Sequence, residues 1–175
     1  MLKGEHIYLR GIEVNDLDFI SQIENNPQNW RYSETLIPFS AESLKNYVIA
    51  DHNLLVDNQI RFIICLKSND KAIGALDLFD YDAIHQRAGT GVLLEKAMRH
   101  KGYATEALKL IVNYAFNFLN LHQLWANISQ DNPKSIMLFE RVGFKQSGNK
   151  IQWQFHGGKW WDVGFYQLIN PNGKG

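Results

Sequence analysis

The segment from Gly102 to Leu119 most constrains the fold of this chain, because it has the periodicity of one long amphipathic helix. Its apolar residues recur every three or four positions, at 104, 107, 108, 111, 115, 118 and 119. Polar residues such as Glu106 and Lys109 occupy the opposite side. A helix with a single apolar stripe buries that stripe against another layer of structure. Strand-like segments lie before and after it, at 88–94 and 124–128, so we expect it to pack on a sheet.

The rest of the sequence predicts an α/β (α+β) fold in which about four helices flank a mainly antiparallel mixed sheet of about seven strands. Apolar patterning predicts strands at 6–10, 60–66, 72–79, 88–94, 124–128, 145–155 and 159–168. Capping residues predict helices at about 16–26, from Ser40 onward, at 102–119 and at 132–143. We find no repeat, linker or low-complexity tract, so residues 1–175 are expected to form a single domain.

Composition narrows the classes of function. The 175 residues include 18 Lys plus Arg and 18 Asp plus Glu, and this neutral balance argues against a nucleic-acid or anionic-membrane partner. The single cysteine, Cys65, lies in an apolar run and is expected to be a buried strand residue. The first residues lack the apolar core of a signal peptide, and no apolar run is long enough to span a membrane. We therefore expect a cytoplasmic protein without a metal site.

A basic stretch, Arg99-His100-Lys101-Gly102-Tyr103-Ala104-Thr105, leads into the long helix. The N-terminus of a helix presents unpaired backbone N–H groups and a partial positive charge, and both favour phosphate. Glycine lets an anion approach the backbone closely, and the basic side chains can add charge-assisted bonds. The Gly-Lys-Ser/Thr ending of a Walker loop is missing. The stretch predicts a phosphate site of another kind, with a solvated basic loop as the alternative.

A second motif follows about thirty residues later. In the first motif Arg99, Gly102 and Ala104 fit the pattern R-x-x-G-x-A, directly after a strand. In the second, Asn132 and Ser135 open the next predicted helix. Together they resemble the cofactor signatures of the GNAT superfamily of N-acetyltransferases, and the resemblance extends over nearly the whole chain. It is most similar to the spermidine N-acetyltransferases and to the enzymes that acetylate the N-termini of ribosomal proteins.

The resemblance implies that acetyl-CoA binds as co-substrate in a cleft between the strands at 88–94 and 124–128. It implies that backbone N–H groups of residues 99–104 hold the pyrophosphate. Asn132 then bonds the pantetheine arm, with a plain helix cap as the alternative role or an additional one. The cofactor-binding residues predicted in this way are Val92, Leu93, Leu94, Arg99, His100, Lys101, Gly102, Tyr103, Ala104, Thr105, Asn132 and Ser135.

The resemblance also implies direct transfer of acetyl from the thioester to an amine, which must first lose a proton. A backbone N–H near Leu93 or Leu94 would stabilise the oxyanion. Asp77 matches a glutamate of the polyamine branch, and Glu34 lies in a loop where that branch gathers acids, so both are candidate catalytic carboxylates. A position on the solvent face of a strand is the alternative for Asp77. Many members carry a proton-donating tyrosine where this chain has Phe139, and phenylalanine cannot donate.

Several functions stand as hypotheses at this stage. The first is an acetyl-CoA-dependent N-acetyltransferase acting on a small-molecule primary amine, with a polyamine such as spermidine as the candidate. The second is acetylation of a peptide N-terminus of the ribosomal-protein type. The third is a non-catalytic acyl-CoA-binding module, motivated by Phe139 and by the lack of a carboxylate in Ala88-Gly89-Thr90-Gly91, where the polyamine branch tends to carry a glutamate. Nucleic-acid binding rests only on the three basic residues 99–101. Because the polyamine branch tends to form large assemblies, a homo-oligomer is also expected.

Overall fold

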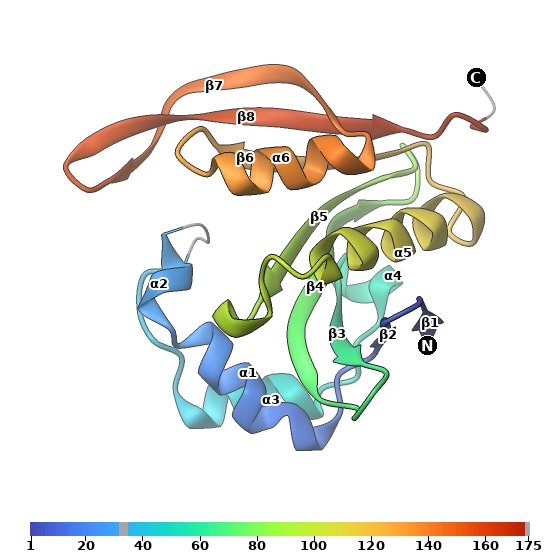
Figure 1. The fold of residues 1–175 in the computed structure, drawn as a ribbon, viewed down its shortest axis with the longest axis vertical. Coiled ribbons are helices and arrows are strands. Elements are labelled where there is room, and N and C mark those ends of the chain that lie inside the picture. Colours follow the sequence, from blue (N-terminus) through green and yellow to red (C-terminus); the bar gives the residue numbers. More distant parts are fainter. Residues whose placement is uncertain (32–34, 174–175) are drawn as a thin grey trace.

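The structure is a computed structural model that describes residues 1–31 and 35–173, and it folds around one mixed sheet (Figure 1). The strands are β1 (Leu2–Lys3), β2 (Ile7–Arg10), β3 (Ile60–Leu66), β4 (Ala72–Asp82), β5 (Arg87–Leu94), β6 (Gln123–Ser129), β7 (Lys145–His156) and β8 (Lys159–Ile169). Their order in the sheet is β1-β2-β3-β4-β5-β6-β8-β7. Each neighbouring pair is antiparallel, except β5 with β6, which is parallel.

The helices connect these strands along the chain. They are α1 (Leu17–Glu24), α2 (Pro27–Trp30), α3 (Ala41–Ile49), α4 (Leu54–Asp57), α5 (Tyr103–Asn117) and α6 (Pro133–Val142), with short 3₁₀ turns η1 (Val14–Asp16) and η2 (Lys96–Met98). Within the described ranges, no helix is both long enough and apolar enough to cross a membrane.

The predicted fold class is confirmed, and the structure adds three short elements to it, β1, α2 and α4. Strand β1 has two residues, too few for any periodicity to show. The helix predicted at 16–26 ends at Glu24, and α2 starts at Pro27. The Asn26 side chain caps α2 by accepting the N–H of Gln28 at 3.0 Å. Proline suits the first helical position of α2, where its missing N–H is not needed.

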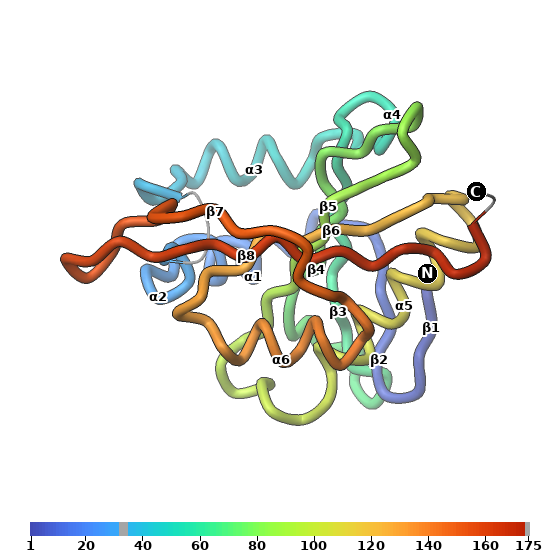
Figure 2. The backbone as a smooth tube through the Cα atoms, turned by 90° about the horizontal axis from the view of Figure 1, so that it is seen from above, coloured from blue at the N-terminus to red at the C-terminus, as the bar shows by residue number. Residues whose placement is uncertain are grey.

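Strand β3 is buried on both faces of the sheet, which explains its continuous apolar run. Side chains alternate across a strand. Phe62 and Ile64 pack in the main core with residues of α5 such as Ile111. Ile63 and Cys65 face the other way and pack with α1 and α3, so Cys65 is buried as expected. Helices α5 and α6 therefore cover one face and α1 and α3 the other, as Figure 2 shows for α3 and α6.

Strands β5 and β6 pair only where they begin. The parallel register joins three residue pairs, from Arg87 with Gln123 to Gly89 with Trp125, although both strands run on for several more residues. Beyond these pairs the strands diverge, and the two halves of the sheet separate in Figure 1. Each diverging strand has one edge that the other no longer covers. Such an edge offers N–H and C=O groups to an extended ligand.

An aromatic cluster marks the point where β5 and β6 separate. Phe79 of β4 stands edge-on to Trp125 of β6 with ring centroids 5.2 Å apart, and Trp125 lies 5.7 Å from Phe165 of β8. Gly89 lies against the Phe79 ring, because a Cβ built on Gly89 would come within 2.3 Å of it. The missing side chain at Gly89 thus allows Phe79 to reach the other half of the sheet.

We predict that Gly89→Ala destabilises the fold because the new methyl group displaces Phe79 from Trp125. Overpacking of this kind costs about 1–3 kcal/mol of the free energy of unfolding, which urea titration would measure. Gly91→Ala is the matched control on the same strand, since its Cβ would lie 3.9 Å from the Phe79 ring. Equal stability of the two variants would show that the Phe79–Trp125 contact does not depend on the missing side chain at Gly89.

Candidate active site

The loop that enters α5 has the backbone shape that an anion site requires. Gly102 caps the helix in the left-handed region at φ +88°, and His100 also has a positive φ of +64°. The first N–H of the helix to find a backbone acceptor is that of Glu106, which donates to the Gly102 carbonyl at 3.1 Å. The N–H groups at the start of α5 precede that bond, as at any helix N-terminus. A Cβ on Gly102 would meet open space, so the backbone is accessible from that side.

The three basic side chains of this loop do different things. The Arg99 guanidinium donates to the Leu94 carbonyl at 3.0 Å and to Asn29 Oδ1 at 3.2 Å, so it ties the loop to the end of β5 and to α2. His100 and Lys101 are exposed. The direct pyrophosphate contact predicted for Arg99 therefore competes with bonds that the guanidinium already makes inside the protein, and backbone groups remain the main feature of the anion site.

Asn132 has the capping role that was one of its two predicted roles. Its side-chain oxygen accepts the N–H of Ser135 at 3.2 Å, with Pro133 at the first helical position of α6. The side-chain NH₂ is not used by that cap. Phe139, one turn further on, is 3% exposed and packs edge-on against Phe144 at 5.0 Å. A buried ring therefore stands where the family resemblance implied a proton donor.

Val92, Leu93 and Leu94 form the end of β5 that no longer pairs with β6. Val92 and Leu93 are half-buried and Leu94 is buried. One edge of this segment is covered by β4, where Leu94 pairs with Gly74. The structure thus brings together the predicted pantetheine strand, the predicted anion loop and the start of α6 at the open end of the sheet.

Asp77 lies on the opposite face of the sheet, the face covered by α1 and α3, and it is not free. Arg61 of β3 holds it through two hydrogen bonds, Nε to Oδ1 at 2.7 Å and Nη2 to Oδ2 at 2.9 Å. Arg61 also pairs with Glu24 of α1. Burial disfavours the charged guanidinium, but the two carboxylates outweigh it and raise the pKa of Arg61. Two carboxylates on one guanidinium leave this group with a formal charge of −1.

A cavity of about 390 Å³ opens beside this ion-paired group. Tyr47 of α3, His52 and Phe79 line it together with Asp77 and Arg61. Burial raises the pKa of the Tyr47 hydroxyl, so this group is a neutral hydrogen-bonding partner in the wall. Aromatic and acidic groups around one hollow are suited to an ammonium group.

Sequence reasoning missed Glu24, Arg61 and Tyr47 as parts of this site. They come from α1, β3 and α3, and no motif links them. The available signal was Arg61 itself, a charged residue in an apolar strand, which required a buried partner. Glu34, the second predicted catalytic carboxylate, lies outside the described residues.

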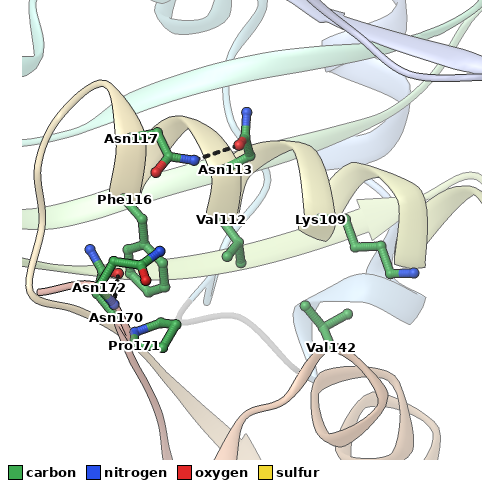
Figure 3. A pocket seen from close by; sticks show the side chains of 9 residues that line it. All are labelled: Lys109, Val112, Asn113, Phe116, Asn117, Val142, Asn170, Pro171 and Asn172. Atoms are coloured by element: carbon green, nitrogen blue, oxygen red, sulfur yellow. Dashed lines mark hydrogen bonds between the residues drawn. The ribbon is translucent and has the colours of Figure 1, made fainter.

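A second, smaller cavity of about 240 Å³ lies along the later turns of α5, next to the end of β8 (Figure 3). Its walls are rich in asparagine, and within it Asn117 donates to Asn113 at 2.6 Å. None of the predicted cofactor or catalytic residues that the structure describes lines it. This cavity is therefore separate from the open end of the sheet, where those residues lie.

Comparison with known proteins identifies the family of the chain. The family model described as "Acetyltransferase (GNAT) domain" matches residues 6–145. The spermidine N(1)-acetyltransferase of Vibrio cholerae is 28% identical, with 91% of each chain covered. A crystal structure of spermidine N-acetyltransferase from Vibrio cholerae in complex with CoA and spermine has a TM-score of 0.85 at 26% identity, covering 95% of this chain and 97% of that one. The "Putative ribosomal N-acetyltransferase YdaF" of Bacillus subtilis is 25% identical, with 98% of this chain and 96% of that protein covered. Both branches of the predicted resemblance are thus among the relatives.

Proposed function

The chain belongs to the GNAT acetyltransferase family, and from this premise we propose that it transfers the acetyl group of acetyl-CoA to a primary amine of a polyamine. The observation that carries the proposal is the open end of the sheet, where β5 and β6 diverge between an anion loop on one face and an acid-lined cavity on the other. One substrate can then approach from each face. The proposal also includes the cytoplasmic location and homo-oligomeric assembly that the sequence led us to expect.

The residues present fit acetyl-CoA. Backbone N–H groups at the start of α5, with the open approach at Gly102, would hold the pyrophosphate. The unpaired edge of β5 at Val92–Leu94 would hold the pantetheine arm as a strand-like partner. The amide of Asn132 would add a bond from its free NH₂ group. Acetyl-CoA supplies the activated thioester, and these groups orient it toward the acceptor.

The acceptor side fits an alkyl ammonium group. Glu24 and Asp77 outnumber the one guanidinium between them, so the site attracts a cation. Tyr47 and Phe79 offer aromatic faces or edges in the same cavity. The relatives named for spermidine, and the related structure that holds spermine, support a polyamine over other amines. Asp77 also remains our candidate to accept the first proton of the ammonium group.

The test of this proposal is CoA release from acetyl-CoA over a panel of amines. The panel contains spermidine, spermine, short diamines, amino sugars and peptides with free N-termini. We expect selective turnover of polyamines. Selective turnover of peptides would instead support the ribosomal-protein type, which the relative from Bacillus subtilis favours. Acetyl-CoA binding without turnover of any amine would support the non-catalytic module.

We predict that Asp77→Asn lowers kcat/KM for spermidine by about 10- to 100-fold, because Arg61 is then left paired with Glu24 alone and the site loses its negative charge. Acetyl-CoA affinity, measured by calorimetry, should not change. Asp80→Asn is the matched control, since Asp80 is exposed on the same strand. Equal kcat/KM for the two variants would remove Asp77 from the acceptor site.

A further inference from the structure

A buried aspartate joins three separate parts of the chain near the open end of the sheet. Asp131, in the loop between β6 and α6, has a side chain that is 3% exposed. His156, at the end of β7, places Nε2 at 2.7 Å from Asp131 Oδ2. Arg31, directly after α2, forms an ion pair with the same Oδ2. Figures 1 and 2 both show the β7–β8 tip beside α2. Neither the family motifs nor the acceptor cavity includes this group.

The group lies on the face of the sheet that carries the acceptor cavity. Phe165 of β8 packs with Trp125, which also contacts Phe79 of that cavity. Alternation along β8 puts Trp161 on the same face as Phe165. The His156 ring stacks on Trp161, with centroids 5.5 Å apart and planes 14° apart. His156 therefore stands on the acceptor side.

Measured along the strand direction, Asp131 and His156 lie near the end of β5. The parallel register that pairs Arg87 with Gln123 places Ser129 opposite Leu93 across the divergence. Asp131 follows Ser129 by two residues and directly precedes Asn132. An amine that reaches the thioester near Leu93 from the acceptor face would therefore approach the part of the molecule where Asp131 and His156 lie.

The carboxylate beside His156 is ionised at neutral pH. Burial by itself raises the pKa of Asp131, but the Ser129 hydroxyl, Arg31 and His156 outweigh it and hold that pKa below its usual range. Asp131 is therefore a carboxylate at neutral pH. The other cation in the group is Lys159, whose Nζ lies over the Trp161 ring at 4.2 Å from the centroid. Because Nε2 is the ring nitrogen that lies next to the carboxylate, Nδ1 is the nitrogen left for exchange with a substrate.

We propose that His156, oriented by Asp131, is the proton carrier of acetyl transfer in this chain, and takes the place of the tyrosine that Phe139 replaces. This inference rests on the proposed function. The arrangement has the logic of a carboxylate–histidine pair, in which the carboxylate fixes the ring and stabilises the imidazolium. His156 is the catalytic residue in this proposal, and Asp131 is the positioning residue.

The acceptor ammonium first loses one proton through Asp77 or solvent. The neutral amine nitrogen then attacks the thioester carbon, so the C–N bond forms and the C–S bond breaks. The remaining excess N–H proton passes to Nδ1 of His156. The imidazolium then gives this proton to the departing CoA sulfur, so the products are the amide and CoA thiol, and His156 is neutral again.

The experiment compares wild type, His156→Gln and Asp131→Asn by the pH dependence of kcat with the best acceptor from the amine panel. We expect His156→Gln to lower kcat by about 10²- to 10⁴-fold with acetyl-CoA affinity retained. We expect the wild-type kcat to rise with pH, because only a neutral imidazole can accept the N–H proton. Asp131→Asn removes the charge that favours the imidazolium, so this rise should move to lower pH. His85→Gln, at an exposed turn, is the control and should match wild type.

A second readout does not depend on turnover. The pKa of His156, followed by NMR of labelled histidine, should be lower in Asp131→Asn than in wild type. An unchanged pKa, or a His156→Gln variant with wild-type kcat and pH profile, overturns the proposal. If Asp131 and His156 only hold α2 against the β7–β8 hairpin, both variants will have a lower melting temperature and an unchanged pH profile of kcat. If the polyamine proposal fails, the wild-type protein will turn over a different acceptor from the panel. The pH dependence of kcat is then measured with that acceptor.

Discussion

Gly102→Val is expected to abolish acetyl-CoA binding while the fold survives. Gly102 has a φ of +88°, where a β-branched residue is strained, and its open side is the approach to the first N–H groups of α5. A valine side chain would occupy that approach and shift the N–H groups that are meant to face the pyrophosphate. Each charge-assisted hydrogen bond lost is worth about 1.5–3 kcal/mol. Loss of one or two weakens binding by on the order of 100-fold or more, which calorimetry with acetyl-CoA would measure.

The control for this experiment must carry the same backbone strain at a place that binds no cofactor. Gly158 meets this need, because it has a φ of +74° in the β7–β8 turn and a Cβ there also meets open space. Gly158→Val should lose a comparable amount of stability, about 1–3 kcal/mol, and bind acetyl-CoA as wild type does. If both variants bind equally well, the pyrophosphate does not lie at the start of α5.

The sequence predicted most of the fold because its elements carry strong local signals. The stripe along α5, the Asn132 cap and Pro133 of α6, and the two glycines of the last turn each depend on neighbouring residues alone. The turn confirms this, since Gly157 and Gly158 have φ values of +60° and +74°, as a two-residue hairpin requires. Short elements such as β1 and α4 were missed because few residues give little periodicity.

The site could be predicted only where a motif is local. The cofactor loop is one continuous stretch, and its glycine has the positive φ and the open approach that a close anion contact needs. The acceptor side is assembled from residues that are distant in sequence, so the partners of Asp77 and of Asp131 could not be read from spacing.

The buried pair of Arg10 and Asp16 is expected to be the most sensitive polar contact for stability. Asp16 is 4% exposed, and its oxygens accept two Arg10 bonds at 2.6 and 2.8 Å and the N–H of Glu13 at 2.8 Å. These bonds join β2 to η1, just before α1. Asp16→Ala leaves the Arg10 guanidinium in a poorly solvated place without its partner. Breaking one side of such a pair costs about 3–5 kcal/mol, which denaturant unfolding at pH 7 would show.

The same pair predicts a pH dependence with a definite sign. Burial alone would raise the pKa of Asp16, but the bonds from Arg10 and Glu13 outweigh it and lower that pKa. A carboxylate with a lowered pKa in the folded state stabilises the fold above its ordinary pKa, and this contribution is lost as the pH falls through about 4 and below. The difference between wild type and Asp16→Asn should therefore be full at pH 7 and shrink in acid. Asp18→Ala, exposed on α1, is the control and should change stability by no more than about 0.5 kcal/mol. A difference that is the same at pH 7 and pH 3 would show that packing, and not the ionised carboxylate, accounts for the effect.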